Sequence, residues 1–275
     1  MSEAPVATRG GERLRRAFAD AGRPLFMPYV MGGFPDLDSS AALARALAPH
    51  ADLIELGIPF SDPLADGPTI QAAGQRALDA GTRPEDVIEV AAQLRDGPPV
   101  VLMTYVNVIL AMGAPAFMRR AADAGAAGVI VPDVPIDEGD GLRAAAREVG
   151  LAIVPLAAPT TSDERLDAIG AEADGFVYCV SVAGVTGGDV AVGDMLRGFL
   201  VRARQRIPAP LAVGFGIRTP DQVAAIGEIA DGVIVASELI RRIDAAADRD
   251  AAIAAVTEFA RRARAALDAG ATTAG

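Results

Sequence analysis

The segment Asp231-Gly-Val-Ile-Val235 is one of four short stretches that share a pattern and decide the predicted fold. Each opens on a small or acidic residue and continues into aliphatic side chains, and segments of helical period rich in alanine and arginine lie between them. The other three are Ala51-Asp-Leu-Ile-Glu55, Ala127-Gly-Val-Ile-Val131 and Asp174-Gly-Phe-Val-Tyr178. Because strands that alternate with helices form parallel sheets, this repetition predicts an α/β fold.

The whole chain contains eight predicted strands, these four stretches among them, separated by helical patterns. Eight strand–helix units in 275 residues predict a single (β/α)8 barrel, the TIM barrel, although the pattern alone also allows an open, doubly wound sheet. The predicted strands cover residues 25–31, 52–58, 100–106, 128–134, 152–156, 175–182, 211–217 and 232–236, and the helical patterns include 39–48, 138–149, 163–169, 190–206 and 220–229.

No linker rich in proline, glycine or serine divides the chain, so one domain is expected over residues 1–275. Leu14 and Phe18 lie four residues apart, which predicts a short helix that caps the bottom of the barrel. Residues 1–8 and 270–275 are expected to be loose ends.

The composition excludes several classes of protein. Hydrophobic residues make up 51% and charged residues 22% of the chain, which is typical of a globular protein. A net charge of −11 argues against nucleic acid and anionic membranes as partners. The N-terminus is polar and no apolar segment suits a secretory signal or a membrane span, so a cytoplasmic protein is expected.

Missing residue types limit the chemistry further. All 25 basic residues are arginine, and the absence of lysine excludes lysine Schiff bases, covalently bound pyridoxal phosphate and Walker-type phosphate loops. His50 and Cys179 are the single histidine and the single cysteine, so neither a zinc site nor a disulfide is expected. We therefore expect no metal and no cofactor, and proton transfer by carboxylates or tyrosines.

The segment 52–59 carries a glutamate inside a predicted strand. Alternation places Glu55 toward the barrel interior, because the opposite face of the strand holds only aliphatic residues. A buried carboxylate is either used in chemistry or paired with a neighbouring strand, and both interpretations remain open. The loop that follows contains Asp62 and Asp66, which either cap the next helix from Thr69 or place a second carboxylate over the barrel mouth.

Three strand ends in the C-terminal half are candidates for a phosphate site. Segments 183–188 and 214–217 contain glycine turns, and Ala236-Ser237 precedes a short helix. Backbone N–H groups of glycine turns and of a helix N-terminus bind phosphate without lysine, and barrels often place this site after strands seven and eight. Each glycine alone is also compatible with a plain turn.

The three tyrosines of the chain all fall on predicted strands. Alternation turns Tyr29, Tyr105 and Tyr178 toward the barrel interior together with Met103, where they either line a pocket or fill the core. The same alternation turns Cys179 toward the helices.

The string Glu55-Leu-Gly-Ile-Pro-Phe-Ser-Asp-Pro-Leu-Ala-Asp-Gly-Pro-Thr69 resembles the signature of the tryptophan synthase α subunit family. The resemblance covers roughly residues 14–267, and further motifs follow in the family's order. They are Pro28-Tyr-Val with Gly-Phe-Pro-Asp36, Met103-Thr-Tyr-Val-Asn107, Pro132-Asp-Val-Pro135, Ala183-Gly-Val-Thr-Gly187 and Gly214-Phe-Gly-Ile217.

The resemblance implies a metal-free retro-aldol cleavage of indole-3-glycerol phosphate to indole and glyceraldehyde 3-phosphate. It implies that Glu55 protonates C3 of the indole and takes the proton of the glycerol hydroxyl, while Asp66 stabilises the indole N–H proton. It also implies that Thr186, on a mobile loop, packs on Asp66 when the site closes. The residues implied for the indole pocket are Tyr29, Met103, Tyr105, Ile130, Leu156 and Tyr178, and those implied for phosphate are Gly187, Phe215, Gly216, Ala236 and Ser237.

In the family, the α subunit passes indole to a pyridoxal-phosphate β subunit within an α2β2 complex, and the loop with Asp62 contacts this partner. The expected function is therefore the α reaction of tryptophan biosynthesis. Two alternatives stay open, namely a stand-alone indole-releasing lyase of the same chemistry and a non-catalytic barrel that only activates a β subunit. Ala236 departs from the glycine common in the family, but it keeps the N–H that phosphate needs.

Overall fold

The strands of the described residues run parallel in one sheet. The computed structural model describes residues 7–180, 191–214 and 216–273. Within these residues the strand order is β5-β4-β3-β2-β1-β9-β8-β7-β6, with a parallel pairing at every step. The strands are β1 (Leu25–Met31), β2 (Ile54–Gly57), β3 (Val100–Met103), β4 (Gly128–Ile130), β5 (Ala152–Val154), β6 (Leu156–Ala157), β7 (Val177–Val180), β8 (Leu211–Gly214) and β9 (Gly232–Val235).

Two short strands close the ring. β5 pairs with β4 and β6 pairs with β7, and only Pro155 separates β5 from β6 in the chain. Proline has no N–H to donate to a strand ladder, but the carbonyl oxygen of Pro155 accepts from the N–H of Tyr178 at 3.0 Å. The predicted fifth strand is therefore divided at the proline, and the expected eight-stranded barrel is confirmed.

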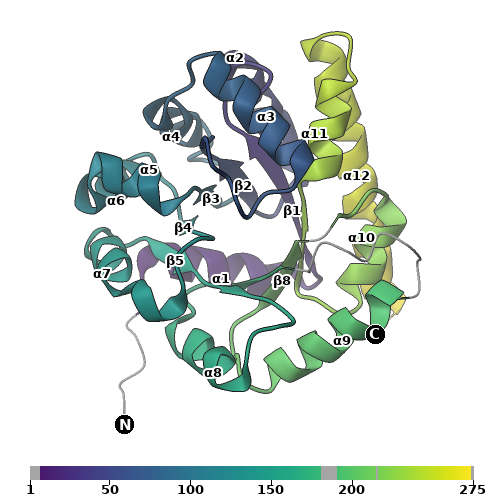
Figure 1. Cartoon of the computed structure of the whole chain (residues 1–275). Coiled ribbons are helices and arrows are strands. Elements are labelled where there is room, and N and C mark those ends of the chain that lie inside the picture. Colours follow the sequence, from purple (N-terminus) through teal and green to yellow (C-terminus); the bar gives the residue numbers. More distant parts are fainter. Residues whose placement is uncertain (1–6, 181–190, 215, 274–275) are drawn as a thin grey trace.

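Helices surround the ring of strands (Figure 1). Several begin at a residue whose side chain accepts a free backbone N–H, as Asp36 does for α2 and Ser162 for α8. The helices are α1 (Arg9–Ala21), α2 (Leu37–Leu47), the 3-10 turn η1 (Ala48–His50), α3 (Pro68–Asp79), α4 (Pro84–Ala92), α5 (Val106–Met112), α6 (Ala114–Asp123), η2 (Ile136–Glu138), α7 (Asp140–Val149), α8 (Asp163–Glu172), α9 (Ala191–Arg204), α10 (Pro220–Gly227), α11 (Ser237–Asp244) and α12 (Arg249–Thr273).

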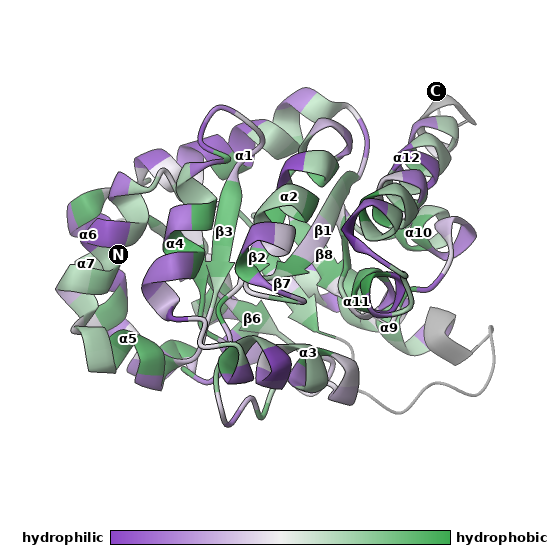
Figure 2. Ribbon diagram, turned by 90° about the horizontal axis from the view of Figure 1, so that it is seen from above, coloured by the Kyte–Doolittle hydropathy of each residue, from purple (hydrophilic) through white to green (hydrophobic). Residues whose placement is uncertain are grey.

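Alternation along each strand separates an inner from an outer apolar layer. Around β2, Ile54 and Leu56 pack toward the helices, whereas Leu53 packs in the barrel interior. Cys179 lies in the outer layer, as predicted. Because both faces of a parallel barrel are buried, the strands are apolar along nearly their whole length (Figure 2).

The N-terminal helix closes one end of the barrel, as predicted. α1 lies across the barrel behind the strands in Figure 1, and its Leu14 is fully buried in the interior cluster. The rings of Phe18 and Phe176 lie with their centroids 5.6 Å apart. Helix and barrel are thus joined by the side chains that the sequence singled out.

Described residues near both ends of the chain belong to helices. Thr8 is 7% exposed, and its hydroxyl donates to the carboxylate of Asp174 at 2.6 Å. The same hydroxyl accepts from the N–H of Gly11, which makes Thr8 the N-cap of α1. At the other end α12 continues to Thr273.

Two strands end earlier than their sequence patterns predict. The third strand was expected to reach residue 106, but β3 ends at Met103 and α5 begins at Val106. The fourth was expected to reach residue 134, but β4 ends at Ile130, two residues before a proline. These early turns put more of both connections at the mouth of the barrel, where the C-terminal ends of parallel strands meet.

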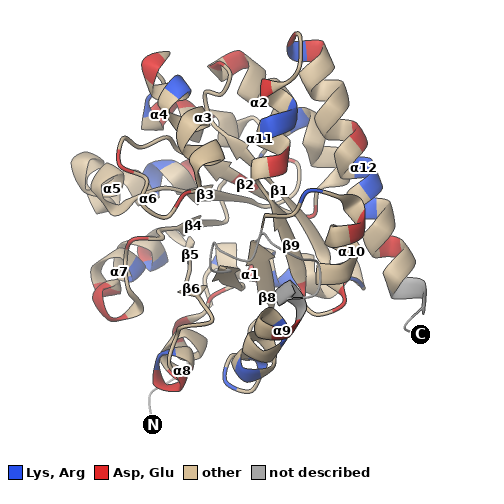
Figure 3. Cartoon of the chain, turned by 45° about the vertical axis from the view of Figure 1, so that its right-hand side comes forward, with Lys and Arg blue, Asp and Glu red and all other residues tan. Residues whose placement is uncertain are grey.

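Charged residues lie mainly on the helices and loops around the barrel (Figure 3). Many form surface ion pairs, such as Arg206 with Asp163 at 2.7 Å and with Asp167 at 2.8 Å. Isolated exposed pairs contribute little to stability, so the barrel depends on its apolar layers. In the part of the chain that the structure describes, no helix is both long and apolar enough to cross a bilayer.

Candidate active site

Glu55 is a carboxylate buried at the mouth of the barrel. The parallel register places it between Tyr29 of β1 and Val101 of β3. The residue is 3% exposed, and its Oε2 atom has no hydrogen-bond partner among the described residues. Burial, and secondarily the nearby Asp66, raises the pKa of Glu55 from an ordinary 4.5 to about 8. Glu55 is therefore mainly protonated at neutral pH.

Asp66 is held over the same mouth by the loop between β2 and α3. Its Oδ2 atom accepts from the hydroxyl of Tyr105 at 3.0 Å, and the same hydroxyl accepts from the N–H of Ala65 at 3.1 Å. The rings of Tyr105 and Phe60 stack with centroids 5.2 Å apart. Tyr105 thus fixes both the backbone and the side chain of this loop.

The environment of Asp66 differs from that of Glu55. Burial raises the pKa of Asp66 to about 6, against the lowering effect of the hydrogen bond from Tyr105. Asp66 is therefore mainly ionised at neutral pH. The alternative that a loop aspartate caps α3 is wrong for Asp66, because Gly67 is the N-cap and no side chain caps this helix.

The two remaining tyrosines complete the mouth. Burial and the nearby Glu55 and Asp66 carboxylates raise the pKa values of Tyr29 and Tyr178 well above the ordinary value. Both phenols occupy space that only a glycine leaves open. A Cβ atom on Gly57 would lie 2.0 Å from the Tyr29 hydroxyl, and one on Gly214 would lie 2.2 Å from the Tyr178 hydroxyl.

The apolar residues predicted to line the site are brought together. Most of them belong to the interior cluster or pack against it, and this cluster is largely apolar. The hydroxyl of Tyr29 lies 3.7 Å from the sulfur of Met31, which links it to the outer layer as well. Of the predicted residues, Met103, Tyr105 and Ile130 belong to the interior cluster, Leu156 and Tyr178 pack against it, and Tyr29 belongs to the outer cluster.

Three of the residues predicted to bind phosphate lie in the described part of the chain. Ala236 is the N-cap of α11 and Ser237 is its first residue, as expected, and Gly216 is exposed after β8. The predicted residues Thr186, Gly187 and Phe215 lie outside the described residues.

Glu238, in the first turn of α11, was not foreseen as part of this region. Its carboxylate pairs with Arg242 at 2.8 Å and Arg241 at 3.2 Å. An unpaired acid at a helix N-terminus would repel a bound anion. The two arginines, three and four residues further along the same helix, neutralise that charge.

Two residues that support the site were not predicted from the sequence. Gln71, in the first turn of α3, donates from Nε2 to the carbonyl oxygen of Asp66 at 2.8 Å. Asp133 accepts from the N–H of Val106. The contact of Asp133 with Val106 joins separate connections and has no local sequence signal, whereas Gln71 lies only five residues after Asp66. Asp62, the predicted partner contact, is exposed, and its carboxylate accepts from the hydroxyl of Ser61 at 2.6 Å.

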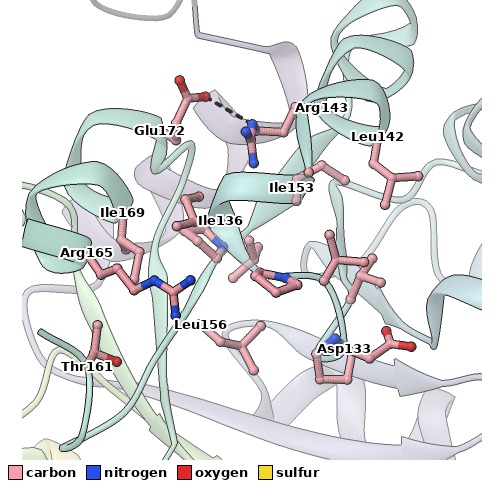
Figure 4. A pocket seen from close by; sticks show the side chains of 17 residues that line it. Asp133, Ile136, Leu142, Arg143, Ile153, Leu156, Thr161, Arg165, Ile169 and Glu172 are labelled. Atoms are coloured by element: carbon pink, nitrogen blue, oxygen red, sulfur yellow. Dashed lines mark ion pairs between the residues drawn. The ribbon is translucent and has the colours of Figure 1, made fainter.

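A cavity of about 300 Å³ opens beside this site, between α7, α8 and the ends of β4 and β5 (Figure 4). Its wall is mostly aliphatic, and it includes the buried ion pair of Arg143 with Glu172, whose Nε and Oε2 atoms lie 3.3 Å apart. Leu156 and Asp133 belong to the wall, but Glu55 and Asp66 do not. Among residues 7–180, 191–214 and 216–273, no group of three or more His, Cys, Asp or Glu side chains is arranged to hold a metal ion.

The fold and the site together define a class of protein. A parallel TIM barrel that carries a buried carboxylate on β2 and a half-buried one in the loop after it, both with raised pKa values, is typical of an enzyme. The model of the family described as "Tryptophan synthase alpha chain" matches residues 16–268. The chain belongs to this family. It is accordingly a lyase of tryptophan biosynthesis and one subunit of a tryptophan synthase complex.

Individual relatives agree. The tryptophan synthase alpha chain of Carboxydothermus hydrogenoformans is 46% identical over 238 residues, which cover 84% of this chain and 89% of that protein. The alpha chain of Roseiflexus sp. strain RS-1 is 50% identical over 230 residues, with 82% of this chain and 88% of that protein covered.

Solved structures of the same name superpose closely. The alpha subunit of Legionella pneumophila is similar with a TM-score of 0.85 and 36% identity, over 95% of this chain and 99% of that chain. Tryptophan synthase of Mycobacterium tuberculosis gives a TM-score of 0.85 and 34% identity, over 95% of this chain and 98% of that chain.

Proposed function

We propose that the chain cleaves indole-3-glycerol phosphate to indole and glyceraldehyde 3-phosphate, with Glu55 and Asp66 as its catalytic pair. The observation that carries this proposal is the difference between the two carboxylates. Burial raises the pKa of Glu55 to about 8, whereas the pKa of Asp66, with its hydrogen bond from Tyr105, is about 6. One acid and one base are thereby available together at neutral pH.

Glu55 acts at the carbon that joins the ring to the glycerol chain. Its carboxylic acid gives a proton to C3 of the indole, and the resulting carboxylate takes the proton of the adjacent glycerol hydroxyl. The carbon–carbon electron pair then passes into the ring, and the hydroxyl carbon leaves as the aldehyde. A general acid–base group of this kind contributes about 10²–10⁴ in rate.

Asp66 acts at the ring nitrogen. As C3 is protonated, the nitrogen becomes more acidic, and the ionised carboxylate accepts its N–H proton and returns it when indole forms. The resulting C3-protonated tautomer, the indolenine, is the electron sink for bond cleavage, a role that a lysine imine has in other aldolases, and this chain contains no lysine. The apolar interior around both carboxylates supports this role, because it strengthens electrostatic interactions.

Binding of the substrate is divided between the interior and the far strand ends. The indole ring contacts Met103, Ile130, Leu156 and the three tyrosines. The phosphate accepts hydrogen bonds from the backbone N–H groups of Gly216, Ala236 and Ser237. Gly187 and Phe215 are proposed for the same phosphate site and Thr186 for closure over Asp66, from the family resemblance alone.

The partner is proposed to be the pyridoxal-phosphate β subunit in a cytoplasmic α2β2 complex, with the whole chain as one domain. Asp62 and the neighbouring Leu64, which is 92% exposed, support contact of this loop with another protein. Among the described residues it is the most exposed of the large apolar side chains, ahead of Leu110 at 60%.

Indole release from indole-3-glycerol phosphate by the purified chain, in chelator, with and without a β subunit, tests the proposal. Slow turnover that rises sharply with the partner is expected. Fast turnover without the partner would identify a stand-alone lyase, and partner activation without cleavage by the chain would identify a non-catalytic activator.

Substitutions at the two carboxylates test the mechanism. Glu55→Gln and Asp66→Asn should each lower kcat by about 10²–10⁴ while the protein stays folded. Glu89→Gln, at an exposed glutamate of α4, is the matched control and should retain full activity. Ordinary turnover by either folded active-site variant would refute the two-carboxylate mechanism.

A further inference from the structure

Three successive connections after β2, β3 and β4 are joined by side chains at the barrel mouth. Asp66 lies in the first, Tyr105 in the second and Asp133 in the third. The Tyr105 hydroxyl donates to Asp66 Oδ2 at 3.0 Å, and the two carboxylate oxygens of Asp133 lie 3.0 and 3.2 Å from the Val106 nitrogen. Because Val106 directly follows Tyr105, these contacts form a continuous path from Asp133 to Asp66.

Helix α5 lacks a side-chain cap of its own. Its N-cap residue is Tyr105, whose side chain makes no capping bond. The first N–H groups of a helix need acceptors, and small polar residues usually supply one at this position. Here the acceptor for Val106 comes from Asp133 in the next connection, which leaves the Tyr105 side chain to reach Asp66.

We infer that Asp133 is a positioning residue for Asp66, acting through the backbone of Val106 and the phenol of Tyr105. The inference rests on the proposed catalytic role of Asp66. By anchoring the Val106 N–H, Asp133 fixes the start of α5, and the stiff phenol side chain carries that position to the carboxylate. Such positioning matters because a misplacement of about 1 Å can cost about 10²-fold in rate.

Asp133 has no competing ionic partner in the part of the chain that the structure describes. In Figure 4 its carboxylate is turned away from Arg143 and Arg165, which belong to the opposite wall of the cavity. Those arginines pair with Glu172 and Asp137 instead. Asp133 is therefore oriented toward the N–H of Val106 and not toward an arginine.

The acid–base behaviour of Asp66 gives a readout specific to positioning. Asp66 is faced by Glu55 from β2, Tyr29 from β1, Tyr178 from β7 and Tyr105, and of these only Tyr105 donates to it. That bond lowers the pKa of Asp66. If Tyr105 shifts, the pKa of Asp66 rises and the acid limb of the kcat/KM profile moves to higher pH. Loss of helix stability alone would leave the acid limb in place.

The test compares three variants with wild type over a range of pH, assayed alone and with saturating β subunit. Asp133→Ala should lower kcat/KM about tenfold and move the acid limb upward, and Asp133→Asn, which keeps an acceptor, should stay within about twofold of wild type. The matched control is Asp248→Ala, which removes the carboxylate that accepts from Ala251 at 2.8 Å near the start of α12. It should leave both quantities unchanged.

A second variant removes the donor and leaves Asp133 intact. Val106→Pro lacks the N–H, and proline is well tolerated as the first residue of a helix. It should reproduce the Asp133→Ala phenotype, and the double variant should be no slower than either single one.

Additive effects of the two changes, or a wild-type acid limb in folded Asp133→Ala, would overturn the inference. A wild-type chain that cleaves no substrate would instead contradict the proposed function, so the two failures are distinguishable.

Discussion

Replacing Glu55 with glutamine should stabilise the folded chain at alkaline pH and leave its stability nearly unchanged in acid. Glu55 is 3% exposed, and its Oε2 atom has no partner among the described residues. Its carboxylate form therefore loses hydration on folding and gains no hydrogen bond at that oxygen in return. Glutamine has nearly the same shape and carries no charge at any pH.

The size of the effect follows from the two pKa values. Folding raises the pKa of Glu55 from 4.5 to about 8. Below pH 4.5 both the folded and the unfolded chain hold the proton, so this group does not alter stability. Between pH 4.5 and 8 the unfolded chain loses the proton while the folded chain keeps it, so stability falls as pH rises. At about 1.36 kcal/mol for each pH unit, the loss reaches about 5 kcal/mol above pH 8.

Urea unfolding of wild type and Glu55→Gln at pH 5 and pH 8.5 measures this loss. Other titrating groups are the same in both chains, so the difference between their unfolding free energies isolates Glu55. That difference should grow in favour of the variant by about 4 kcal/mol from the lower to the higher pH, because part of the full loss already falls below pH 5. The exposed control Glu89→Gln should follow wild type at both values. A difference that stays constant, or that favours wild type at pH 8.5, would refute the reasoning.

Two further predictions concern the same site. The profile of kcat/KM against pH should be bell-shaped, with an acid limb near 6 and a basic limb near 8, because cleavage needs ionised Asp66 and protonated Glu55. A flat profile between pH 5 and 9 would contradict it. Gly214→Ala should destabilise the chain by about 1–3 kcal/mol and lower activity, since the new Cβ atom would lie 2.2 Å from the Tyr178 hydroxyl. Gly198→Ala in α9, where the added atom meets nothing within 4 Å, should instead stabilise it by about 0.5–1 kcal/mol. Thermal unfolding of the two alanine variants decides between these directions.

The sequence was enough to predict an α/β barrel and the direction in which most strand side chains point. Alternation has a period of two residues and is local, so it correctly sent Cys179 outward and Met103 inward without any knowledge of neighbouring strands. The long string from Glu55 to Thr69 identified the family, and both proposed catalytic carboxylates lie within it.

The contacts that hold the carboxylate of Asp66 in place are apparent only in the tertiary structure. Asp66 accepts a hydrogen bond from Tyr105, 39 residues further along the chain. Val106 donates a hydrogen bond to Asp133, 27 residues further along. A local sequence pattern does not indicate contacts between separate connections. The strand that was expected to continue to residue 106 ends at Met103, and this early end was not predicted from the local pattern either. The pKa of Glu55 depends on burial and on the nearby Asp66, and the pKa of Asp66 depends on burial and on its hydrogen bond from Tyr105. These surroundings exist only once the barrel has closed.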